Sequence, residues 1–377
     1  MKPKHLIILI CIAVVLGIIY MAQQGKRKDA AGTAGSRELV PADFSSDNLA
    51  AVKLERGGKT VTLKQTGNGW AVEERYGYPA DTAKLRELFV KLCDARIAQT
   101  LSLIPTQLEE LSLTPEKATV MTLTDKNVKL LQRFVFGSEH GNRPDSAAPY
   151  GMGGGSGRYL QLADGRNVVV PERFSEVDAS LTDWLNRDFF QVSDLKRAEL
   201  RRNGKSEWVL TFKDGKPVLS GGIPADKELD ETKASALKSA YSWIRFSDVA
   251  DPKAAPGTTG MDKAPELLLT DGDDLVYTVR PGAGADDNYF LRVSVAWKGE
   301  AKRTAPAGEK PEDKKRLDAE FAQTVKERQE KAAKLDKALS PWTYQVEKSV
   351  FDASAGTRDG FLKAKAKTEA PPATDPK

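Results

Sequence analysis

Cysteine and histidine are scarce in this chain of 377 residues, which contains only two of each. Cys11 lies in an N-terminal apolar run and Cys93 on a predicted helix, so the sequence predicts neither a disulfide framework nor a zinc-binding cluster. His5 precedes the apolar run, which leaves only His140 as a general base in the folded part. The net charge is +4 and is spread along the chain, which argues against a nucleic-acid partner.

Catalytic and cofactor motifs are also missing. The glycine-rich segment "YGMGGGSGRY" (150–159) matches neither GxGxxG nor GxxxxGK[ST], and a strand-like run follows it instead of a helix. The acidic "DGDD" (271–274) lacks EF-hand spacing and is interpreted as a β-turn. We therefore expect no catalytic, metal or cofactor-binding residue and a non-enzymatic protein. A hydrolase that uses carboxylates such as Asp183 and Asp188 stays open as a third alternative.

The longest apolar run is Leu6–Ala22, "LIILICIAVVLGIIYMA", which carries no charge and is long enough to span a bilayer. Its length, and the lack of a small-x-small cleavage site after it, favour an uncleaved signal anchor over a cleaved signal peptide. Both alternatives stay open. We expect a cytoplasmic N-terminus at 1–5, a transmembrane anchor at 6–22 and a flexible stalk at 23–41. The bulk of the chain would then lie outside the cytoplasm.

The rest of the chain contains one module written twice. In the first copy, "AVKLER" and "KTVTLKQ" flank Gly57-Gly58, which is a two-residue hairpin signal. Asp81 then caps an amphipathic helix. The apolar residues of this helix follow helical spacing: Leu85, Leu88, Phe89 and Leu92. Further strand-like runs follow at 119–123 and 130–136.

The second copy keeps this order, with turns at Asn203-Gly204 and Asp214-Gly215 and a helix that begins near Glu231 after the cap Asp230. Its predicted core residues are Ala234, Leu237, Tyr241 and Ile244. The hairpin "PELLLTDGDDLVYTVRPG" (265–282) matches "ATVMTLTDKNVKLLQRFVFG" (118–137). The ends also look alike, with "SLTDWLNRDFFQVS" (180–193) resembling "ALSPWTYQVEKSVFDAS" (338–354).

These patterns predict an α+β fold, made of a duplicated module of antiparallel β-hairpins plus one amphipathic helix per copy and preceded by one N-terminal transmembrane helix. The first copy is expected at 42–195 and the second at 196–362. A charged helix at 309–339 in the second copy has a narrow apolar stripe, which we expect to pack within its own domain rather than on a partner helix. Residues 363–377 are Lys-, Ala- and Pro-rich and are expected to be disordered.

Most aromatic residues, Trp243 among them, are expected in the core. Tyr76 and Tyr78 are expected exceptions, because they lie beside Gly77 and Pro79 in a loop where exposed tyrosines would form a protein-contact patch. Tyr150 and Tyr159, at the ends of the glycine-rich segment, complete the candidate partner-contact residues.

Two stretches carry a resemblance to a known family: "GYPADTAKLRELFVKL" (77–92), and the long run from "YLQLADGRNVVVPERF" (159–174) to "DLKRAELRR" (194–202). With the N-terminal apolar run before them and the second copy after them, the chain resembles the bacterial domain-of-unknown-function family numbered 4340 over about residues 42–361. The resemblance implies a membrane-proximal hydrophobic segment. It also implies genes beside ABC-2-type permeases and an auxiliary subunit like those of gliding-motility systems, and it transfers no catalytic residue.

Taken together, the sequence predicts a single-pass protein of the bacterial inner membrane with an extracytoplasmic duplicated domain. Its expected role is that of a non-enzymatic accessory or scaffold protein of an ABC-type envelope transport complex. The expected partners are the membrane and, through the resemblance, an ABC-2-type permease or auxiliary subunit. The alternative is an extracytoplasmic module that binds a glycan or peptide in the cleft between the two copies.

Overall fold

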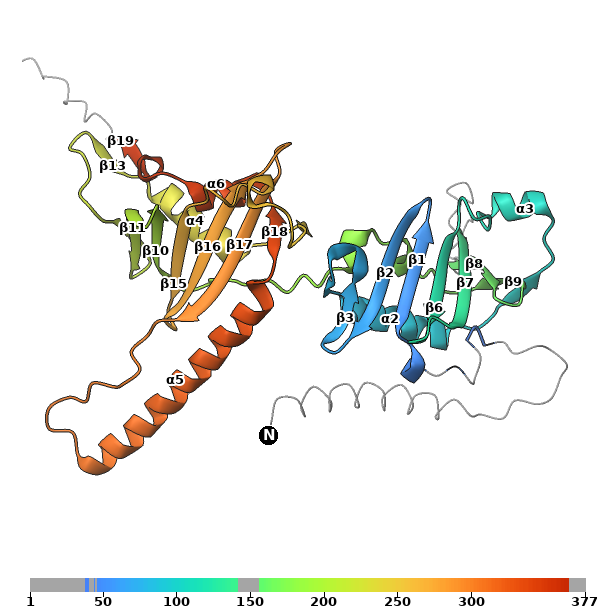
Figure 1. Ribbon diagram of the computed structural model, residues 1–377, viewed down its shortest axis with the longest axis horizontal. Helices are drawn as coiled ribbons and strands as arrows, with labels where there is room; N and C mark the ends of the chain where they lie inside the picture. The colour runs from blue at the N-terminus through green and yellow to red at the C-terminus, as the bar shows by residue number, and fades with distance from the viewer. Residues whose placement is uncertain (1–37, 41–43, 45, 142–155, 366–377) are drawn as a thin grey trace, which may run out of the picture. The chain divides into compact units, whose positions relative to one another are not determined.

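The structure is a computed structural model that describes residues 38–40, 44, 46–141 and 156–365 (Figure 1). The chain divides into two compact units, Met1–Asn186 and Arg187–Lys377. The division precedes the expected boundary at 195, because the segment before that boundary packs in the second unit. There Phe190 stacks on Tyr277, with ring centroids 5.5 Å apart, and Phe189 contacts Tyr344 at 4.5 Å.

The first unit is built on a nine-stranded antiparallel sheet. In sheet order its strands are β4 (Tyr78–Pro79), β3 (Gly69–Val72), β2 (Lys59–Thr66), β1 (Ala51–Arg56), β6 (Thr119–Thr124), β7 (Leu130–His140), β8 (Gly157–Leu162), β9 (Asn167–Val170) and β5 (Gln99–Leu101). Helix α2 (Thr82–Asp94) lies against one face and buries Leu85, Leu88 and Leu92 (Figure 1). The shorter elements are η1 (Ser46–Asn48), η2 (Glu73–Arg75), α3 (Pro105–Glu110), η3 (Ser175–Asp178) and η4 (Leu181–Trp184).

The second unit has an eight-stranded antiparallel sheet and a separate two-stranded one. In sheet order the larger contains β12 (Lys216–Leu219), β11 (Lys205–Lys213), β10 (Leu195–Arg202), β15 (Glu266–Asp271), β16 (Leu275–Ala283), β17 (Tyr289–Trp297), β18 (Thr343–Val346) and β14 (Asp248–Val249). Strand β13 (Lys227–Leu229) pairs with β19 (Leu362–Ala364). The helical elements are α4 (Glu231–Ser242), η5 (Pro256–Thr258), α5 (Pro311–Leu339), α6 (Lys348–Ala355) and η6 (Arg358–Phe361).

The predicted α+β class with antiparallel sheets is confirmed, and so are the local signals that gave it. Gly57 and Gly58 both have positive φ at the β1–β2 turn. Asp81 caps α2 by accepting a 2.9 Å hydrogen bond from the Lys84 backbone N–H. Asp230 caps α4 in the same way, through the N–H groups of Thr232 and Lys233.

The two large sheets run through their strands in one common order. In sheet order, the strands β3-β2-β1-β6-β7-β8-β9-β5 of the first unit correspond one to one to β12-β11-β10-β15-β16-β17-β18-β14 of the second. Corresponding strands also follow one another in the same order along the chain. Both helices also begin in the same way: the backbone N–H of Asp81 bonds the carbonyl of Trp184, and that of Asp230 bonds the carbonyl of Phe361, each at 2.8 Å.

The expected likeness between the ends of the two copies is wrong in detail. Trp184 closes η4, which follows β9, whereas Trp342 precedes β18, the counterpart of β9. By position in the fold, Phe361 of η6 is the counterpart of Trp184. The similar letters around the two tryptophans therefore belong to different elements.

The long charged helix is α5, and its apolar stripe packs within the second unit as expected. Val325, Ala332 and Leu339 are buried, and Asp336 accepts a 2.9 Å hydrogen bond from the Val295 N–H of β17. This bond satisfies β17 beyond the point where its pairing with β18 ends.

The predictions for the two ends of the chain fall wholly or partly outside the described residues. The expected anchor at 6–22, the residues before it and most of the stalk lie outside them, and within the described ranges no helix is long and apolar enough to cross a bilayer. The expected disorder at 363–377 is wrong for its first residues, because Lys363 and Ala364 pair with Glu228 and Lys227 in β19 and β13. The remainder of that segment lies outside the described residues.

Candidate functional site: a groove between α4 and α6

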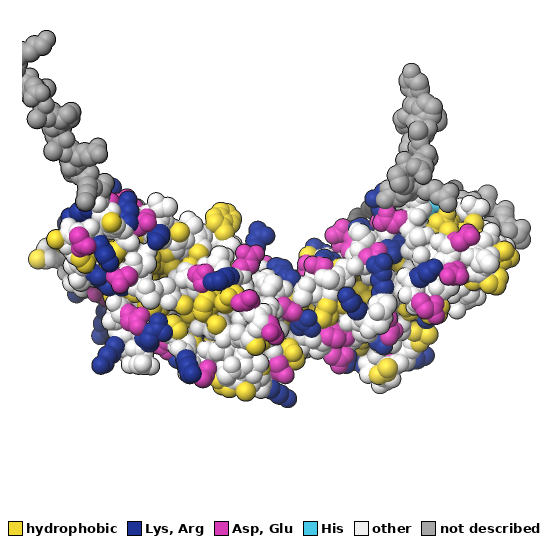
Figure 2. Space-filling model, turned by 90° about the horizontal axis from the view of Figure 1, so that it is seen from above, with side chains coloured by type: hydrophobic (Ala, Val, Ile, Leu, Met, Phe, Trp, Pro, Cys, Tyr) yellow, Lys and Arg dark blue, Asp and Glu magenta, His cyan; other side chains and the backbone are white. Residues whose placement is uncertain are grey.

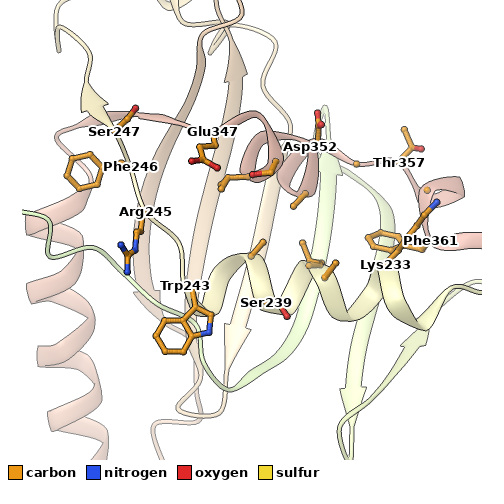
Figure 3. Close-up of a pocket in the computed structure, with 18 residues that line it drawn as sticks. Lys233, Ser239, Trp243, Arg245, Phe246, Ser247, Glu347, Asp352, Thr357 and Phe361 are labelled. Atoms are coloured by element: carbon orange, nitrogen blue, oxygen red, sulfur yellow. The ribbon is translucent and has the colours of Figure 1, made fainter. Parts of the chain in front are cut away.

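The second unit contains a cavity of about 820 Å³ between α4, α6 and η6 (Figure 3). Small and apolar side chains line its interior, among them Ala236, Ala240, Val350 and Ala353. We call this cavity the α4–α6 groove. Its size falls in the range of sites that bind small molecules or short peptide segments.

The sequence of α4 explains where the groove lies. Ala234, Leu237 and Tyr241 are buried beneath the helix, so Ala236 and Ala240 fall on its flank, toward α6. Below the groove, the Tyr241 hydroxyl and the Ser354 hydroxyl are hydrogen-bonded, which ties α4 to α6. Burial raises the pKa of Tyr241, so this hydroxyl stays protonated.

Trp243 stands at one end of the groove and is 75% exposed, which corrects the expectation that it lies in the core. The reason is local. Helix α4 ends at Ser242, and the chain then alternates, so that Ile244 and Phe246 are buried while Trp243 and Arg245 point outward.

Charged side chains stand around this apolar interior. Lys233 lies at the same end as Phe361, and Arg245 lies beside Trp243 at the other, while Glu347 and Asp352 come from the α6 side (Figure 3). Asp352 is also paired with Lys348 at 2.9 Å. On the second unit, at the left of Figure 2, a band of apolar side chains is likewise bordered by basic and acidic ones. An apolar centre with a charged rim is typical of a protein-binding surface.

The first unit differs at the corresponding positions. Glu87 and Lys91 follow the N-cap Asp81 by six and ten residues, as Ala236 and Ala240 follow Asp230. Lys91 forms ion pairs with Glu87 and with the buried Glu176 of η3, and the hydrogen bond that it donates to Glu176 holds the pKa of Lys91 above its usual range. A hollow of about 600 Å³ on α2 is accordingly lined mainly by charged side chains. Alanines in the second unit replace this ion-paired cluster with apolar surface.

Of the four candidate partner-contact tyrosines, the three that the structure describes differ in exposure and do not form one site. Tyr76 is 49% exposed and adopts a left-handed conformation with φ 61°. Tyr78 is only 4% exposed, because it lies in β4 at the sheet edge with its ring turned into the core, and this corrects its predicted exposure. Tyr159, on β8, is half-buried and hydrogen-bonded to His140 Nδ1 at 2.8 Å. Tyr150 lies outside the described residues.

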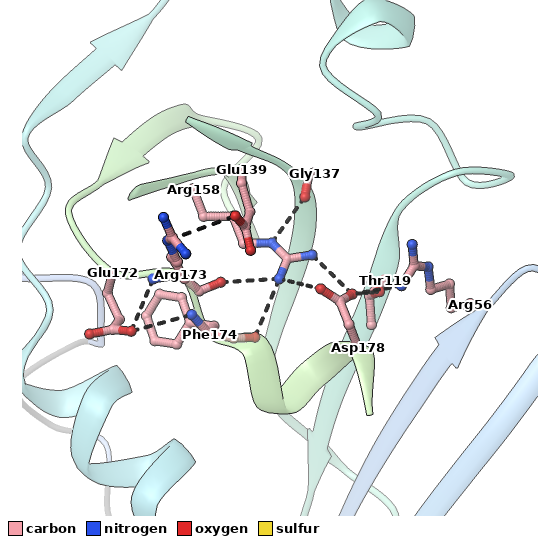
Figure 4. Close-up of polar contacts among 9 residues, drawn as sticks. All are labelled: Arg56, Thr119, Gly137, Glu139, Arg158, Glu172, Arg173, Phe174 and Asp178. Carbon is pink, nitrogen blue, oxygen red and sulfur yellow. Dashed lines mark hydrogen bonds and ion pairs between the residues drawn. The ribbon is translucent and has the colours of Figure 1, made fainter. Parts of the chain in front are cut away.

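The end of the glycine-rich segment has a structural role that the sequence did not indicate. Arg158 is buried on β8 and donates to the carbonyls of Gly137, Arg173 and Phe174 as well as to the carboxylate of Asp178 (Figure 4). Its guanidinium is therefore fully engaged within the first unit.

The carboxylates of the described residues form no metal-binding grouping. Within the described ranges, no group of three or more His, Cys, Asp or Glu side chains is placed to hold a metal ion. Asp183, considered above as an acid, accepts hydrogen bonds from the Ser180 N–H and hydroxyl as part of a capping box.

The sequence alone did not predict the groove, although it contains a signal for it. When the two helices are aligned at Asp81 and Asp230, Ala236 and Ala240 of the second unit stand at the positions of Glu87 and Lys91 in the first. A helix flank that is charged in one unit and made of small residues in the other indicates a different surface.

Comparison with known proteins gives one match. The family model described as "Domain of unknown function (DUF4340)" matches residues 70–264, a range that contains α2 and α4 and extends into both units. No curated protein and no solved structure matches the chain significantly. The chain therefore belongs to the domain-of-unknown-function family DUF4340.

Proposed function

We propose that this protein is a non-enzymatic accessory or scaffold component of an ABC-type envelope transport complex. Residues 6–22 would hold it in the bacterial inner membrane, with both units on the extracytoplasmic side. The α4–α6 groove would bind a partner subunit, either an ABC-2-type permease or an auxiliary subunit. The transport connection comes from the family resemblance, and the binding role comes from the groove.

The observation that carries the binding role is the apolar groove with Trp243 exposed at its end. An exposed tryptophan is costly to leave in water, and tryptophan is among the residues that most often dominate binding energy at protein interfaces. Tyr241 and Ser354 fix the groove from below, so the surface is held in place before a partner arrives.

The shape and charges of the groove favour an amphipathic helix as its occupant. From Lys233 to Trp243 the groove follows α4 for about 15 Å, which equals about three turns of a bound helix. Alanines at 236, 240 and 353 let a helix backbone approach closely. Basic residues at the groove ends and acidic ones on the α6 side then restrict the orientation of that helix through its own charges.

We also propose that the two units descend from one duplicated module, with the binding groove confined to the second. The common strand order and the matching helix entries at Asp81 and Asp230 support this origin. A duplicated unit allows one copy to keep a structural role while the other acquires a binding surface. The Glu87–Lys91–Glu176 cluster and the alanine-lined groove are consistent with such a division.

Site-specific photocrosslinking in native membranes tests the proposed function. A photoreactive amino acid replaces Ala240 in the full chain, and the crosslinked products are identified by mass spectrometry. The matched control carries the same group at Ser235, which is exposed on α4 but does not line the groove. We expect Ala240 to capture an ABC-type permease or auxiliary subunit that Ser235 does not.

A second pair of variants tests the groove chemistry. Replacing Ala236→Glu and Ala240→Lys introduces the residue types found at Glu87 and Lys91, and should abolish co-purification of the same subunit without unfolding the chain. Ser235→Lys should leave co-purification unchanged. If a well-expressed chain recovers no permease or auxiliary subunit, or if the groove variants bind as the wild type does, the proposal is wrong.

A further inference from the structure

The β6–β7 turn exposes two large aliphatic side chains. Val128 is 80% exposed and Leu130 is 51% exposed. Between and beside them, Lys126 and Lys129 are exposed as well. We call residues 126–130 the Val128 tip. Tight turns are normally made of Gly, Pro, Asn, Asp and Ser, and exposed aliphatic side chains are unusual in them. Turn formation alone therefore does not explain the tip.

Val128 occupies a strained backbone conformation. Its φ is 61°, in the left-handed region, where a β-branched side chain is strongly disfavoured. The turn is held by Asp125, whose carboxylate accepts hydrogen bonds from the backbone N–H groups of Asn127 and Lys129. Glycine, asparagine or aspartate would fit this position with less strain, so the valine gives the turn no local advantage.

The second unit contains the same turn with different chemistry. Asp271 accepts from the N–H groups of Asp273 and Leu275, and Asp274 occupies the left-handed position with φ 62°. Aspartate tolerates this conformation. The carboxylates of this turn are also occupied within the unit, because Asp273 and Asp274 pair with Arg328 of α5 at 3.2 and 3.6 Å.

The Val128 tip has no such internal partner. Neither Lys126 nor Lys129 forms an ion pair within the described part of the chain, and the Asp125 carboxylate is turned into the turn itself. The tip thus offers apolar side chains and two positive charges together. A surface that is apolar inside and anionic outside would satisfy both.

The place of the tip in the fold indicates what that surface is. Strand β6 runs antiparallel to β1, with Thr124 opposite Ala51, so the tip lies at the sheet end where β1 begins. The chain reaches this end from its N-terminal part, which contains the apolar run Leu6–Ala22. If residues 6–22 form the proposed anchor, the expected stalk at 23–41 would allow a bilayer to reach this side of the unit.

We propose that the Val128 tip inserts its aliphatic side chains into the surface of an anionic lipid bilayer, with Lys126 and Lys129 at the headgroups. The tip would orient the first unit on the membrane that residues 6–22 anchor, so this inference rests on the anchoring part of the proposed function. Tethering raises the local concentration of lipid at the tip, which makes a small contact effective.

A lipid-quenching experiment on the full chain tests the inference. Variants with Cys11→Ala and Cys93→Ala receive a single cysteine at Val128 or, as the matched control, at Asp274, which has the same backbone conformation. An environment-sensitive fluorophore is attached, and the chain is reconstituted into vesicles of phosphatidylcholine alone or of phosphatidylcholine mixed with phosphatidylglycerol, which is anionic and attracts basic segments. Lipids carrying a nitroxide on the acyl chain serve as quenchers.

We expect quenching at position 128 in the anionic vesicles and none above background at position 274. Lys126→Gln and Lys129→Gln should each lower the equilibrium constant for tip contact about fivefold, because each lysine contributes that much near an anionic surface. Far-UV circular dichroism and thermal unfolding of each variant show that the fold is kept.

The outcomes separate the inference from the proposal beneath it. If the chain does not float with vesicles, the anchoring itself is wrong. If the chain floats but position 128 is no more quenched than 274, or the lysine variants are quenched equally, the tip does not contact lipid. The inference then fails while the proposed function stands, and a protein surface becomes the remaining partner for the tip.

Discussion

Arg158 and Asp178 form a two-pronged ion pair inside the first unit, with Nη1 2.7 Å from Oδ2 and Nη2 3.0 Å from Oδ1. The pair joins β8 to η3, and Thr119 of β6 donates a third bond to the same carboxylate at 3.0 Å. Partial burial raises the pKa of Asp178, but the bonds from Arg158 and Thr119 outweigh it and hold that pKa below its usual range.

Arg158→Met should destabilise the first unit by about 3 kcal/mol, because it removes the two-pronged partner of the half-buried Asp178 carboxylate, together with a donor to three backbone carbonyls. Urea unfolding of the full chain measures this loss. The matched control is Arg166→Met, eight residues further along the chain, whose ion-pair partner Asp164 is exposed. That change should cost less than about 0.5 kcal/mol. Equal losses in the two variants would show that the Arg158 pair has no special structural role.

Short-range signals accounted for most of the fold that the sequence could predict. The Gly57-Gly58 turn and the caps Asp81 and Asp230 each act within a few residues, so the turn and the two helix starts can be predicted without tertiary information. The spacing of Leu85, Leu88 and Leu92 similarly fixes which face of α2 is buried.

The errors arose where tertiary context decided the outcome. Trp243 was expected in the core, but the end of α4 one residue earlier reversed its direction. Tyr78 was expected at the surface, but pairing of β4 with β3 turned its ring inward. Arg158 lies at the end of the glycine-rich segment, where no short-range pattern indicates burial, and only the approach of η3, twenty residues later in the chain, buries its guanidinium against Asp178.

The strain at Val128 gives a second prediction. Val128→Asn should stabilise the first unit by about 1 kcal/mol, because asparagine accepts the left-handed conformation. The reverse exchange, Asp274→Val, should destabilise the second unit by at least as much, since it also removes a pair with Arg328. Thermal unfolding of the full chain compares the two. A destabilising Val128→Asn would mean that the valine makes a contact within the folded chain.

Close backbone approaches on β7 and β16 give a third prediction. A Cβ at Gly137 would meet the Leu111 carbonyl oxygen at 2.4 Å, and one at Gly282 would meet that of Thr259 at 2.1 Å. Both obstacles are backbone atoms, so Gly137→Ala and Gly282→Ala should each cost about 2 kcal/mol in urea unfolding. Gly67→Ala is the control, because a Cβ there meets nothing within 4 Å. If all three variants unfold alike, the loops that cross the two strands are less tightly held than the structure has them.

The pH dependence of stability provides the last prediction, through Glu199 on β10. This buried carboxylate accepts hydrogen bonds from Arg201 Nε at 2.7 Å and Arg197 Nη2 at 2.9 Å. The bond from Arg201, with help from Arg197 and against the effect of burial, lowers the pKa of Glu199 from 4.5 to about 2.

Because the folded pKa lies below the unfolded one, the ionised Glu199 stabilises the fold above pH 4.5, and this contribution is lost as the pH falls toward 2. We expect the loss to be about 2 kcal/mol, less than the full shift implies, since both arginines are exposed enough to be screened by water. Glu199→Gln should lower the free energy of unfolding at pH 7 and should flatten its dependence on pH between 4.5 and 2.5. Glu207→Gln, which breaks the exposed pair with Arg202, should change neither. An unchanged acid limb in Glu199→Gln would assign the acid sensitivity of the second unit to other carboxylates.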